Sequence, residues 1–421
     1  MGKPKIRFEG YTDDWEQRKF SELVTIERGG SPRPIDKFIT NDENGLNWVK
    51  IGDAPEQGNY ITQTAEKIRP EGLSKTREVH PGDLILSNSM SFGRPYIMAI
   101  DGCIHDGWLA IRDTKKNFDL KFLCTLLGTD GMLNQYKAMA AGSTVNNLNK
   151  ELVGGTSVAF PMMKEQIKIG DYFTTIDHLI TLHQRKCDET QKLKKYMLQK
   201  MFPQNGKKVP EIRFSGFTDD WEQRKLGDIL ISLQNNTLSR ADLSNEAGVA
   251  KNVHYGDVLI KFGEVLDVSK EKLPMISDES VLSKYKSSFL QNGDVIVADT
   301  AEDSTVGKCS EIAGLNDVVV LSGLHTIPYR PIEKFASGYL GYYLNSSAYH
   351  NQLLPLMQGI KVTSISKSAM QDTDIVYPKS VEEQGKIGDY FQSLDHLITL
   401  HQRKCDELRI IKKFMLQNMF V

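Results

Sequence analysis

Two short segments of this sequence carry side chains with the chemistry of acid–base catalysis. His105 is followed by Asp106, and Glu302 is followed by Asp303. Such groups transfer protons when a fold holds them beside a substrate. Adjacent acidic and histidine side chains are also common on protein surfaces. The sequence therefore leaves a lone-enzyme interpretation open without favouring it.

Histidine and cysteine form a second group with possible chemistry. His183 and Cys187 lie four residues apart, as do His401 and Cys405, so each pair occupies one face of a helix. Two such helices packed antiparallel would bring together imidazoles and thiolates, which are ligands of structural zinc. Small or half-polar residues also set the register of packed helices, and this interpretation is the one that we prefer. We predict no metal site, and zinc is the alternative.

No catalytic motif accompanies these residues. The sequence has no G-x-x-x-x-G-K-[ST] phosphate loop, no G-x-G-x-x-G, no HExxH and no Asn-Pro-Pro-Tyr-type methyltransferase motif. Five cysteines without a CxxC pair predict reduced thiols and a cytoplasmic protein. We expect no signal peptide, and the uncharged stretch 335–360 is too rich in polar residues for a membrane span.

The length and composition indicate a protein of several globular domains. A chain of 421 residues, 40% hydrophobic and 25% charged, fits two or three domains with buried cores. The net charge of −2 gives no global sign of a nucleic-acid partner, so such a partner has to be argued from local features.

The chain contains two copies of one pattern, in which a short repeat is followed by a variable block and a long repeat. Residues 4–20 return as residues 210–226, with 13 of 17 aligned positions identical. Residues 165–202 return as residues 383–420, with 28 of 38 positions identical. Chance does not produce two such matches in one chain.

The two variable blocks differ in most residues but keep a few in register. With an offset of 217, Leu148 aligns with Ile365. Residues 81–85 and 292–296 both combine a Gly-Asp turn with the start of an apolar run. We predict that the two blocks share a fold and differ in surface.

The residue patterns predict strands in the variable blocks and long helices in the repeats. Runs of β-branched residues at 83–87, 294–298 and 318–321 lie between Gly, Asn and Asp turn residues. In each long repeat, apolar residues recur every three or four positions, as on one face of a helix. We assign the following members of this stripe to the spacer helices or to the binding of partner subunits: Ile169, Phe173, Ile176, Ile180, Met197 and Met201 in the first copy, and Ile387, Phe391, Leu394, Ile398, Met415 and Met419 in the second.

These elements predict an α+β protein in which two long antiparallel coiled-coil helices separate two globular α/β domains, with a pseudo-two-fold internal repeat. Such a stripe is too long to bury on one small domain, so the helices are expected to pack on each other. The predicted boundaries are a first domain at 1–163, a first helix at 164–202, a linker at 203–209, a second domain at 210–381 and a second helix at 382–421.

With these features the sequence resembles the DNA-specificity subunits of type I restriction-modification systems over essentially its whole length. The resemblance is carried by the duplicated TDDWEQRK segments, two dissimilar blocks and two helical repeats that end in MLQKMF and MLQNMF. It implies that each variable block is a target-recognition domain for one half of a bipartite, asymmetric DNA site. It also implies that the helices set the spacing between the halves and dock modification subunits.

The resemblance further implies a division of labour among subunits. Two modification subunits would carry S-adenosylmethionine and methylate adenine, and restriction/translocase subunits would use ATP and Mg²⁺. This chain would be non-catalytic, with no cofactor of its own, and its partners would be double-stranded DNA and those subunits, with no membrane. A pure protein scaffold explains the duplication but not the divergence of the blocks, so we favour the DNA half-sites.

Candidate residues for reading DNA lie in the loops of the variable blocks. Arg and Lys recognise guanine, Asn and Gln recognise adenine, and hydroxyl groups contact phosphates. The candidates of the first block are Arg28, Ser31, Arg33, Lys50, Asn88, Ser89, Ser91, Arg94, Ser143, Thr144, Asn146 and Asn147. Those of the second block are Lys261, Thr300, Ser304, Thr305, Lys308, Lys361, Thr363 and Ser364.

The charges of the blocks predict weak DNA binding by the chain alone. Residues 18–164 contain 18 basic and 17 acidic residues, and residues 224–382 contain 15 and 19. Neutralisation of phosphates supplies most non-specific affinity, and these blocks offer little of it. The exposed faces of the helices, with Lys194-Lys195 and Lys412-Lys413 among their basic pairs, are candidate surfaces for partner subunits, and a solvated helix face is the alternative.

Overall fold

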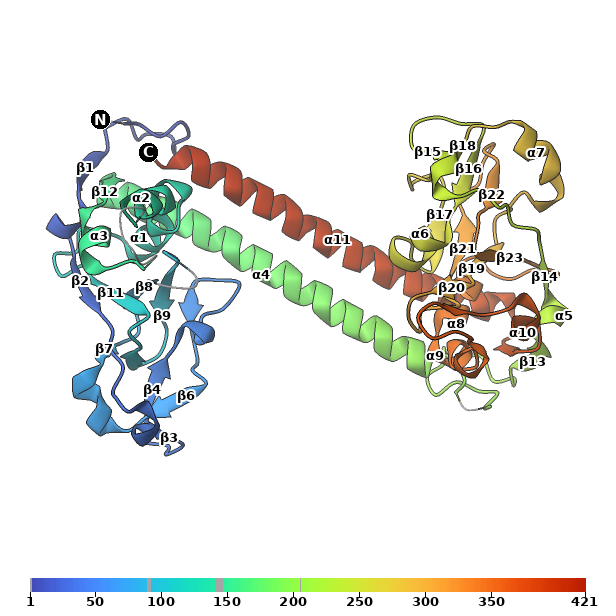
Figure 1. Cartoon of the computed structure of the whole chain (residues 1–421), viewed down its shortest axis with the longest axis horizontal. Coiled ribbons are helices and arrows are strands. Elements are labelled where there is room, and N and C mark those ends of the chain that lie inside the picture. The colour runs from blue at the N-terminus through green and yellow to red at the C-terminus, as the bar shows by residue number, and fades with distance from the viewer. Residues whose placement is uncertain (1, 89–91, 141–146, 205) are drawn as a thin grey trace. The chain divides into compact units, whose positions relative to one another are not determined.

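The computed structural model describes residues 2–88, 92–140, 147–204 and 206–421. The chain divides into two compact units (Figure 1), with Met1–Lys186 and His401–Val421 in unit 1 and Cys187–Leu400 in unit 2. Two long helices, α4 (Met163–Lys200) and α11 (Val381–Met419), each contribute residues to both units.

Unit 1 is a mixed α/β structure built mostly from short strands. Its strands are β1 (Glu16–Lys19), β2 (Thr25–Arg28), β3 (Ile39–Thr40), β4 (Leu46–Val49), β5 (Tyr60–Ile61), β6 (Glu66–Ile68), β7 (Arg77–Val79), β8 (Leu84–Ser87), β9 (Pro95–Met98), β10 (Gly102–Ile104), β11 (Trp108–Arg112) and β12 (Ser157–Phe160). Its shorter helices are α1 (Leu120–Leu127), α2 (Asp130–Ala140) and α3 (Lys150–Gly155).

Unit 2 has the same kind of structure with more short helices. Its strands are β13 (Glu222–Lys225), β14 (Leu230–Ser232), β15 (Leu243–Ser244), β16 (Ala250–Val253), β17 (Val265–Asp267), β18 (Met275–Ile276), β19 (Val295–Ala298), β20 (Thr300–Ala301), β21 (Cys309–Ala313), β22 (Val320–Ser322), β23 (Thr326–Pro331), β24 (Thr363–Ser364) and β25 (Asp374–Tyr377). Its shorter helices are α5 (Leu226–Ile229), α6 (Tyr255–Ile260), α7 (Ser280–Lys284), α8 (Tyr339–Asn345), α9 (Ser347–His350) and α10 (Lys367–Gln371).

The two units share one sheet topology. Unit 1 has a five-stranded sheet in the order β2-β11-β8-β9-β5, and unit 2 has the order β14-β23-β19-β21-β17. A second sheet, β3-β6-β4-β10-β7, corresponds to β15-β18-β16-β22. Residues that the sequence offset of 217 aligns also make equivalent contacts. The backbone N–H of Leu148 donates to the carbonyl oxygen of Asn88, and that of Ile365 donates to the carbonyl oxygen of Asp299. The prediction that the blocks share a fold is confirmed.

The apolar stripe of the long helices is buried in the cores of the units. The core of unit 1 takes Ile169 and Phe173 from the start of α4 and Met419 from the end of α11. The core of unit 2 takes Phe391 from α11 and Met201, which follows the last residue of α4. Most of the predicted stripe therefore faces the chain's own core, which excludes those buried side chains from a partner surface.

The two helices pack antiparallel within each unit. In unit 1, Lys412 Nζ lies 2.5 Å from Asp177 Oδ1. In unit 2, Lys194 Nζ lies 2.6 Å from Asp395 Oδ1. The sequence analysis placed both lysines on an exposed basic face, but their ion pairs leave the Lys412 side chain 28% exposed and that of Lys194 14% exposed.

A buried ion pair joins each short repeat to the start of a long helix. Arg7 Nε lies 2.7 Å from Glu165 Oε1, and Arg213 Nε lies 2.7 Å from Glu383 Oε1. Both carboxylates are almost fully buried, so each depends on its arginine to offset the cost of leaving water. Trp221 adds its indole N–H to Glu383. The two short repeats thus attach each variable block to its helix by the same arginine–glutamate ion pair, whereas the indole N–H of Trp15, the counterpart of Trp221, has no hydrogen-bond partner among the described residues.

Three cysteines lie buried in strands or in a short helix. Cys103, Cys124 and Cys309 are buried free thiols, and burial raises the pKa of Cys103 to about 11 and that of Cys124 to about 12. Among the described residues, no helix combines the length and the apolar composition that crossing a membrane requires.

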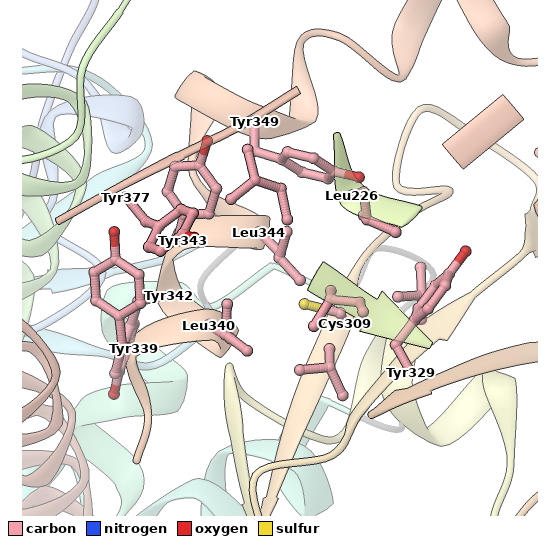
Figure 2. Close-up of a cluster of buried hydrophobic side chains, with 14 of the residues drawn as sticks. Leu226, Cys309, Tyr329, Tyr339, Leu340, Tyr342, Tyr343, Leu344, Tyr349 and Tyr377 are labelled. Atoms are coloured by element: carbon pink, nitrogen blue, oxygen red, sulfur yellow. The ribbon is translucent and has the colours of Figure 1, made fainter. Parts of the chain in front are cut away.

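The core of unit 2 is rich in tyrosine around α8, as Figure 2 shows. Tyr339 and Tyr343 of α8 stack with their ring centroids 6.1 Å apart.

In unit 1 the equivalent helix α1 is capped by Asp119, whose carboxylate accepts from the N–H of Phe122. Ala336 stands at the equivalent position of unit 2. Glu311 compensates from the sheet, because its carboxyl oxygens accept from Gly338 N at 2.6 Å and Gly341 N at 3.0 Å.

We expect Glu311 to make the stability of unit 2 depend on pH. Burial raises the pKa of Glu311 to about 7 despite the hydrogen bonds that it accepts. The folded state therefore holds a proton that the unfolded state loses at its ordinary pKa. The free energy of unfolding should fall as pH rises from about 4.5 to about 7, by about 3 kcal/mol at most.

Urea denaturation of unit 2 between pH 4.5 and pH 7.5 checks this expectation. Glu311→Gln should remove most of the slope, because it cannot titrate. Glu333→Gln, at a half-exposed position, is the matched control and should leave the slope unchanged. An equal slope in wild type and Glu311→Gln would contradict the assignment.

Candidate nucleic-acid interface

Three segments of unit 1 meet at one edge of the sheet β2-β11-β8-β9-β5. β2 ends at Arg28 and β8 ends at Ser87, and both strands pair antiparallel with the beginning of β11. The turn 105–107 joins β10 to β11 at the same edge. Hydrogen bonds from Asn88 N to Gly107 O and from Gly29 N to Trp108 O hold the segments together.

Asp106 organises the polar side chains at this edge. Its Oδ1 accepts from Ser31 Oγ at 2.8 Å and lies 2.8 Å from His105 Nε2. Its backbone carbonyl accepts from Asn88 Nδ2 at 2.8 Å and from Arg28 Nε at 3.4 Å. Four side chains from three segments are thus fixed by one residue, and three of them were predicted from the sequence.

The electrostatics of the cluster favour an ionised Asp106. Partial burial opposes ionisation, but the hydrogen bond from Ser31 and the charges of His105 and Arg28 outweigh it and lower the pKa of Asp106. Ser31 donates to Asp106 and not to His105, so the imidazole is not placed to activate the hydroxyl as a nucleophile. The arrangement is suited to hydrogen bonding.

Two glycines let the loop after β2 approach the neighbouring backbone. A Cβ atom on Gly29 would lie 2.2 Å from the carbonyl oxygen of His105. On Gly30 it would lie 2.4 Å from the carbonyl oxygen of Lys75. Glycine is therefore required at both positions, and the loop follows a path that a side chain would block.

The loop lines an open hollow of about 960 Å³ beside Asp106. Arg33 is an exposed member of the loop, and Lys50 Nζ lies across the hollow, 2.6 Å from Glu66 Oε1. Trp48 forms part of the wall, with its ring 5.8 Å from that of His105. The hollow combines the cations Arg33 and Lys50 with an aromatic wall and the carboxylates of Asp36, Glu66 and Asp106. Side chains of these kinds contact base edges and phosphates.

The other candidates of the first block are placed differently. Asn88 is buried, and its amide is used to hold the turn. Arg94 lies apart from the cluster and donates to the carbonyl of Glu56 at 2.8 Å. Asn147 is exposed next to Leu148, whose N–H binds Asn88. Ser89, Ser91, Ser143, Thr144 and Asn146 lie outside the described residues.

Unit 2 presents a different set of polar groups on the equivalent framework. Asp299 follows β19 as Asn88 follows β8, and its N–H donates to His325 O. Its carboxylate accepts from Thr300 Oγ1 at 2.8 Å and lies 3.4 Å from His325 Nδ1. Tyr255 places its ring 5.3 Å from that of His325. An acid–histidine pair recurs, but it comes from different segments than in unit 1.

The predicted loop residues of the second block fall into two groups. Thr363 and Ser364 pair as β24 with Ala301 and Thr300 of β20, so these candidates lie side by side, and Lys361 precedes them as an exposed residue. Lys261 and Lys308 donate to the backbone carbonyls of Lys272 and Leu259. Ser304 is exposed, and the backbone N–H of Thr305 donates to the carboxylate of Asp303 within the same turn.

Several polar residues at the two edges were not predicted from the sequence. The loop after β14 carries Asn235 and Asn236, and Asn236 Nδ2 donates to Asn252 Oδ1 at 2.6 Å in the interior. The segment has the place of the Arg28–Arg33 loop, but its composition offers no Gly or Arg signal. Burial and the charge of Arg240 lower the pKa of His254, whose ring centroid lies 4.7 Å from that of Tyr255. Only the equivalence of the two folds identifies the loop with Asn235 and Asn236 as part of this edge.

The histidine and cysteine pairs of the helices do not converge on one point. His183 Nδ1 lies 3.0 Å from His401 Nδ1. Cys405 contacts the carbonyl oxygen of Ile180, one turn before His183, whereas Cys187 is one turn after His183 in α4. The thiols thus lie on opposite sides of the histidines. Within the part of the chain that the structure describes, no three metal-ligating side chains come close enough to hold an ion.

Comparison with curated proteins finds relatives along nearly the whole chain. The chain is 24% identical over 415 residues to the type I restriction enzyme MjaVIII specificity subunit of Methanocaldococcus jannaschii, covering 95% of this chain and 91% of the relative. It is 21% identical over 428 residues to the putative type I restriction enzyme MjaX specificity subunit of the same organism, with the same coverage.

Two solved structures share the fold. The S subunit of the type I restriction-modification system from M. genitalium superposes with a TM-score of 0.59 at 12% identity, covering 100% of this chain and 99% of the other. A chain from a structural study of complex assembly in the type I R-M system gives a TM-score of 0.53 at 17% identity, covering 97% and 98%.

The family model for the type I restriction modification DNA specificity domain matches the chain twice, at residues 12–192 and 218–409. The two matches contain the two sheet edges described above. The chain therefore belongs to the type I restriction-modification DNA specificity family.

Proposed function

We propose that the chain is the non-catalytic, sequence-specific DNA-binding subunit of a type I restriction-modification complex. Each unit reads one half of a bipartite, asymmetric site, and helices α4 and α11 fix the spacer between the halves. The observation that carries this proposal is that one backbone framework presents two different polar sets at the same edge. Asp106 holds Ser31 and His105 in unit 1, whereas Asp299 holds Thr300 and approaches His325 in unit 2.

The chemistry of each edge suits the reading of base pairs. Arginine and lysine donate to guanine, asparagine pairs with adenine, and a carboxylate accepts from the amino group of cytosine. Unit 1 offers Arg33, Lys50 and Asp106 around its hollow. Unit 2 offers Asp299, Thr300 and Lys361 near β20 and β24. Because these sets differ, the two half-sites should differ.

The catalytic work belongs to partner subunits in this proposal. Two modification subunits bind S-adenosylmethionine and methylate adenine, and restriction/translocase subunits use ATP and Mg²⁺. The sequence supports this division because it lacks the phosphate-loop and methyltransferase motifs. The exposed faces of α4 and α11 are the proposed contact with the modification subunits.

Removal of the Asp106 carboxylate should weaken the reading of one half-site only. Asp106→Ala frees Ser31 and His105, and the loss of one well-placed base contact costs about 1–3 kcal/mol. We expect methylation by the complex with its modification subunits to fall by about 5- to 150-fold on the cognate site. The tolerance for base changes should increase in one half of the site.

Methylation of duplexes randomised in either half measures this effect. Asp101→Ala is the matched control, since Asp101 also pairs with a histidine, His80, but at an exposed position away from the hollow. Relaxed specificity in both halves, or an equal effect of the control variant, would argue against a local role of Asp106.

Lengthening of the helices should change the spacer and leave both half-sites intact. One additional turn at matched positions of α4 and α11 adds about 5.4 Å. Since base pairs stack at about 3.4 Å, the preferred spacer should grow by one or two base pairs. Methylation sequencing with the variant complex detects the new spacing, and an altered half-site would contradict the modular role of the helices.

The isolated chain should bind DNA weakly and with a shallow dependence on salt. Its blocks carry few excess cations to displace counterions from DNA, and the formal net charge of the chain is −2. Fluorescence anisotropy at 50 and 200 mM salt, with and without the modification subunits, measures the difference. Tight, specific binding by the chain alone would contradict this prediction, because it would show that the chain's own surface is sufficient for DNA binding.

A further inference from the structure

Lys194 of unit 2 is enclosed by two carboxylates and an aromatic ring. Its Nζ lies 2.8 Å from Glu264 Oε2 and 2.6 Å from Asp395 Oδ1. Tyr342, labelled in Figure 2, donates its hydroxyl to Asp395 at 2.6 Å, and its ring centroid lies 5.3 Å from the ammonium group. The cluster fills the space between α8, the long helices and the segment before β17.

Unit 1 repeats this site with two of the four groups exchanged. Lys412 and Asp177 form the same ion pair between the long helices. Thr125 stands at the helix position of Tyr342, at the offset of 217. Asn59 stands at the position of Glu264, because its carbonyl accepts from Ile97 N as that of Glu264 accepts from Glu311 N. Unit 1 thus lacks the second carboxylate and the ring.

A second cation faces the same place in both units. Lys308 of unit 2 and Arg94 of unit 1 each follow a glycine with positive φ, Gly307 and Gly93. The charge of Glu264 acts on Lys308, although burial lowers the pKa of that lysine overall. Arg94 donates to the carbonyls of Glu56 and Gly58 and lies 5.0 Å from the ring centroid of Tyr96. Among the described residues, no carboxylate pairs with Arg94.

In unit 1 a pocket lies beside the exchanged positions. The pocket has a volume of about 450 Å³ and is lined by Asn59, Arg94, Cys124, Thr125, Asp177 and Lys412, among others. Two cations and one carboxylate therefore border a space that in unit 2 holds a second carboxylate and an aromatic ring.

We propose that this pocket of unit 1 is a binding site for a carboxylate group, which takes the place that Glu264 has in unit 2. The carboxylate pairs with Lys412 and Arg94, and the rest of the ligand occupies the space of the missing Tyr342 ring. The carboxylate belongs either to a free organic acid or to an acidic side chain of a partner protein. The proposal does not depend on how the units read DNA.

Benzoate is a suitable probe because it combines a carboxylate with an aromatic ring, and benzamide is its neutral counterpart. Thermal unfolding of the full chain is followed at constant ionic strength with increasing amounts of each compound. At tenfold Kd, benzoate should raise the unfolding midpoint of unit 1 by about 3 to 6 °C in a saturable manner. Benzamide should have no saturable effect.

Substitutions at Asn59 test the site without relying on a probe. Asn59→Glu supplies the missing carboxylate and should raise the unfolding midpoint and abolish the response to benzoate. Asn59→Gln has the same length without the charge and should do neither. In unit 2, Glu264→Asn should lower the unfolding midpoint, and acetate, which fits the smaller space beside Tyr342, should restore it.

Addition of the modification subunit distinguishes the two sources of the carboxylate. Loss of the benzoate response in the complex identifies an acidic side chain of the partner, and a retained response identifies a free acid. The proposal is overturned if benzoate and benzamide act alike on the wild-type chain. It is also overturned if direct calorimetric titration shows benzoate binding equally to wild type and Asn59→Glu.

Discussion

The buried carboxylates of Glu165 and Glu383 constrain the rest of this structure. Each lies in the first turn of a long helix and is enclosed by the short repeat that carries its arginine, Arg7 or Arg213. A buried charge left without its partner costs about 3–5 kcal/mol. The arginine of the short repeat and the glutamate of the long repeat therefore cannot be replaced independently of each other. This requirement explains why the repeats stay nearly identical while the blocks between them differ. It attaches two different surfaces to two helices in the same way.

The framework of each unit is held by backbone hydrogen bonds, which leaves the side chains at the sheet edge free to vary. Asn88 N binds Gly107 O in unit 1, and Asp299 N binds His325 O in unit 2. The residue that makes this backbone hydrogen bond thus has an amide side chain in unit 1 and a carboxylate side chain in unit 2. A pair of half-sites with different base sequences requires such a separation of fold from surface, because each surface can then change alone.

The sequence predicted the helices, the shared fold and the register between the blocks, since periodic apolar residues and turn residues report on local structure. It missed what depends on contacts between distant segments. Asp106 gave no sign that it would fix Ser31 and His105, and the Asn235 loop resembles its counterpart in neither charge nor glycine content. Lys194 and Lys412 read as exposed charges, because helical periodicity does not show the carboxylates that approach from other elements.

The proposed function makes this chain the source of DNA specificity in a modification complex. Methylation sequencing of DNA from cells that express the neighbouring modification subunit, with and without this chain, tests it most directly. A split, asymmetric methyladenine motif that depends on the chain is the predicted result. A modification subunit that is active but produces no motif dependent on the chain would contradict the claim and favour a protein scaffold.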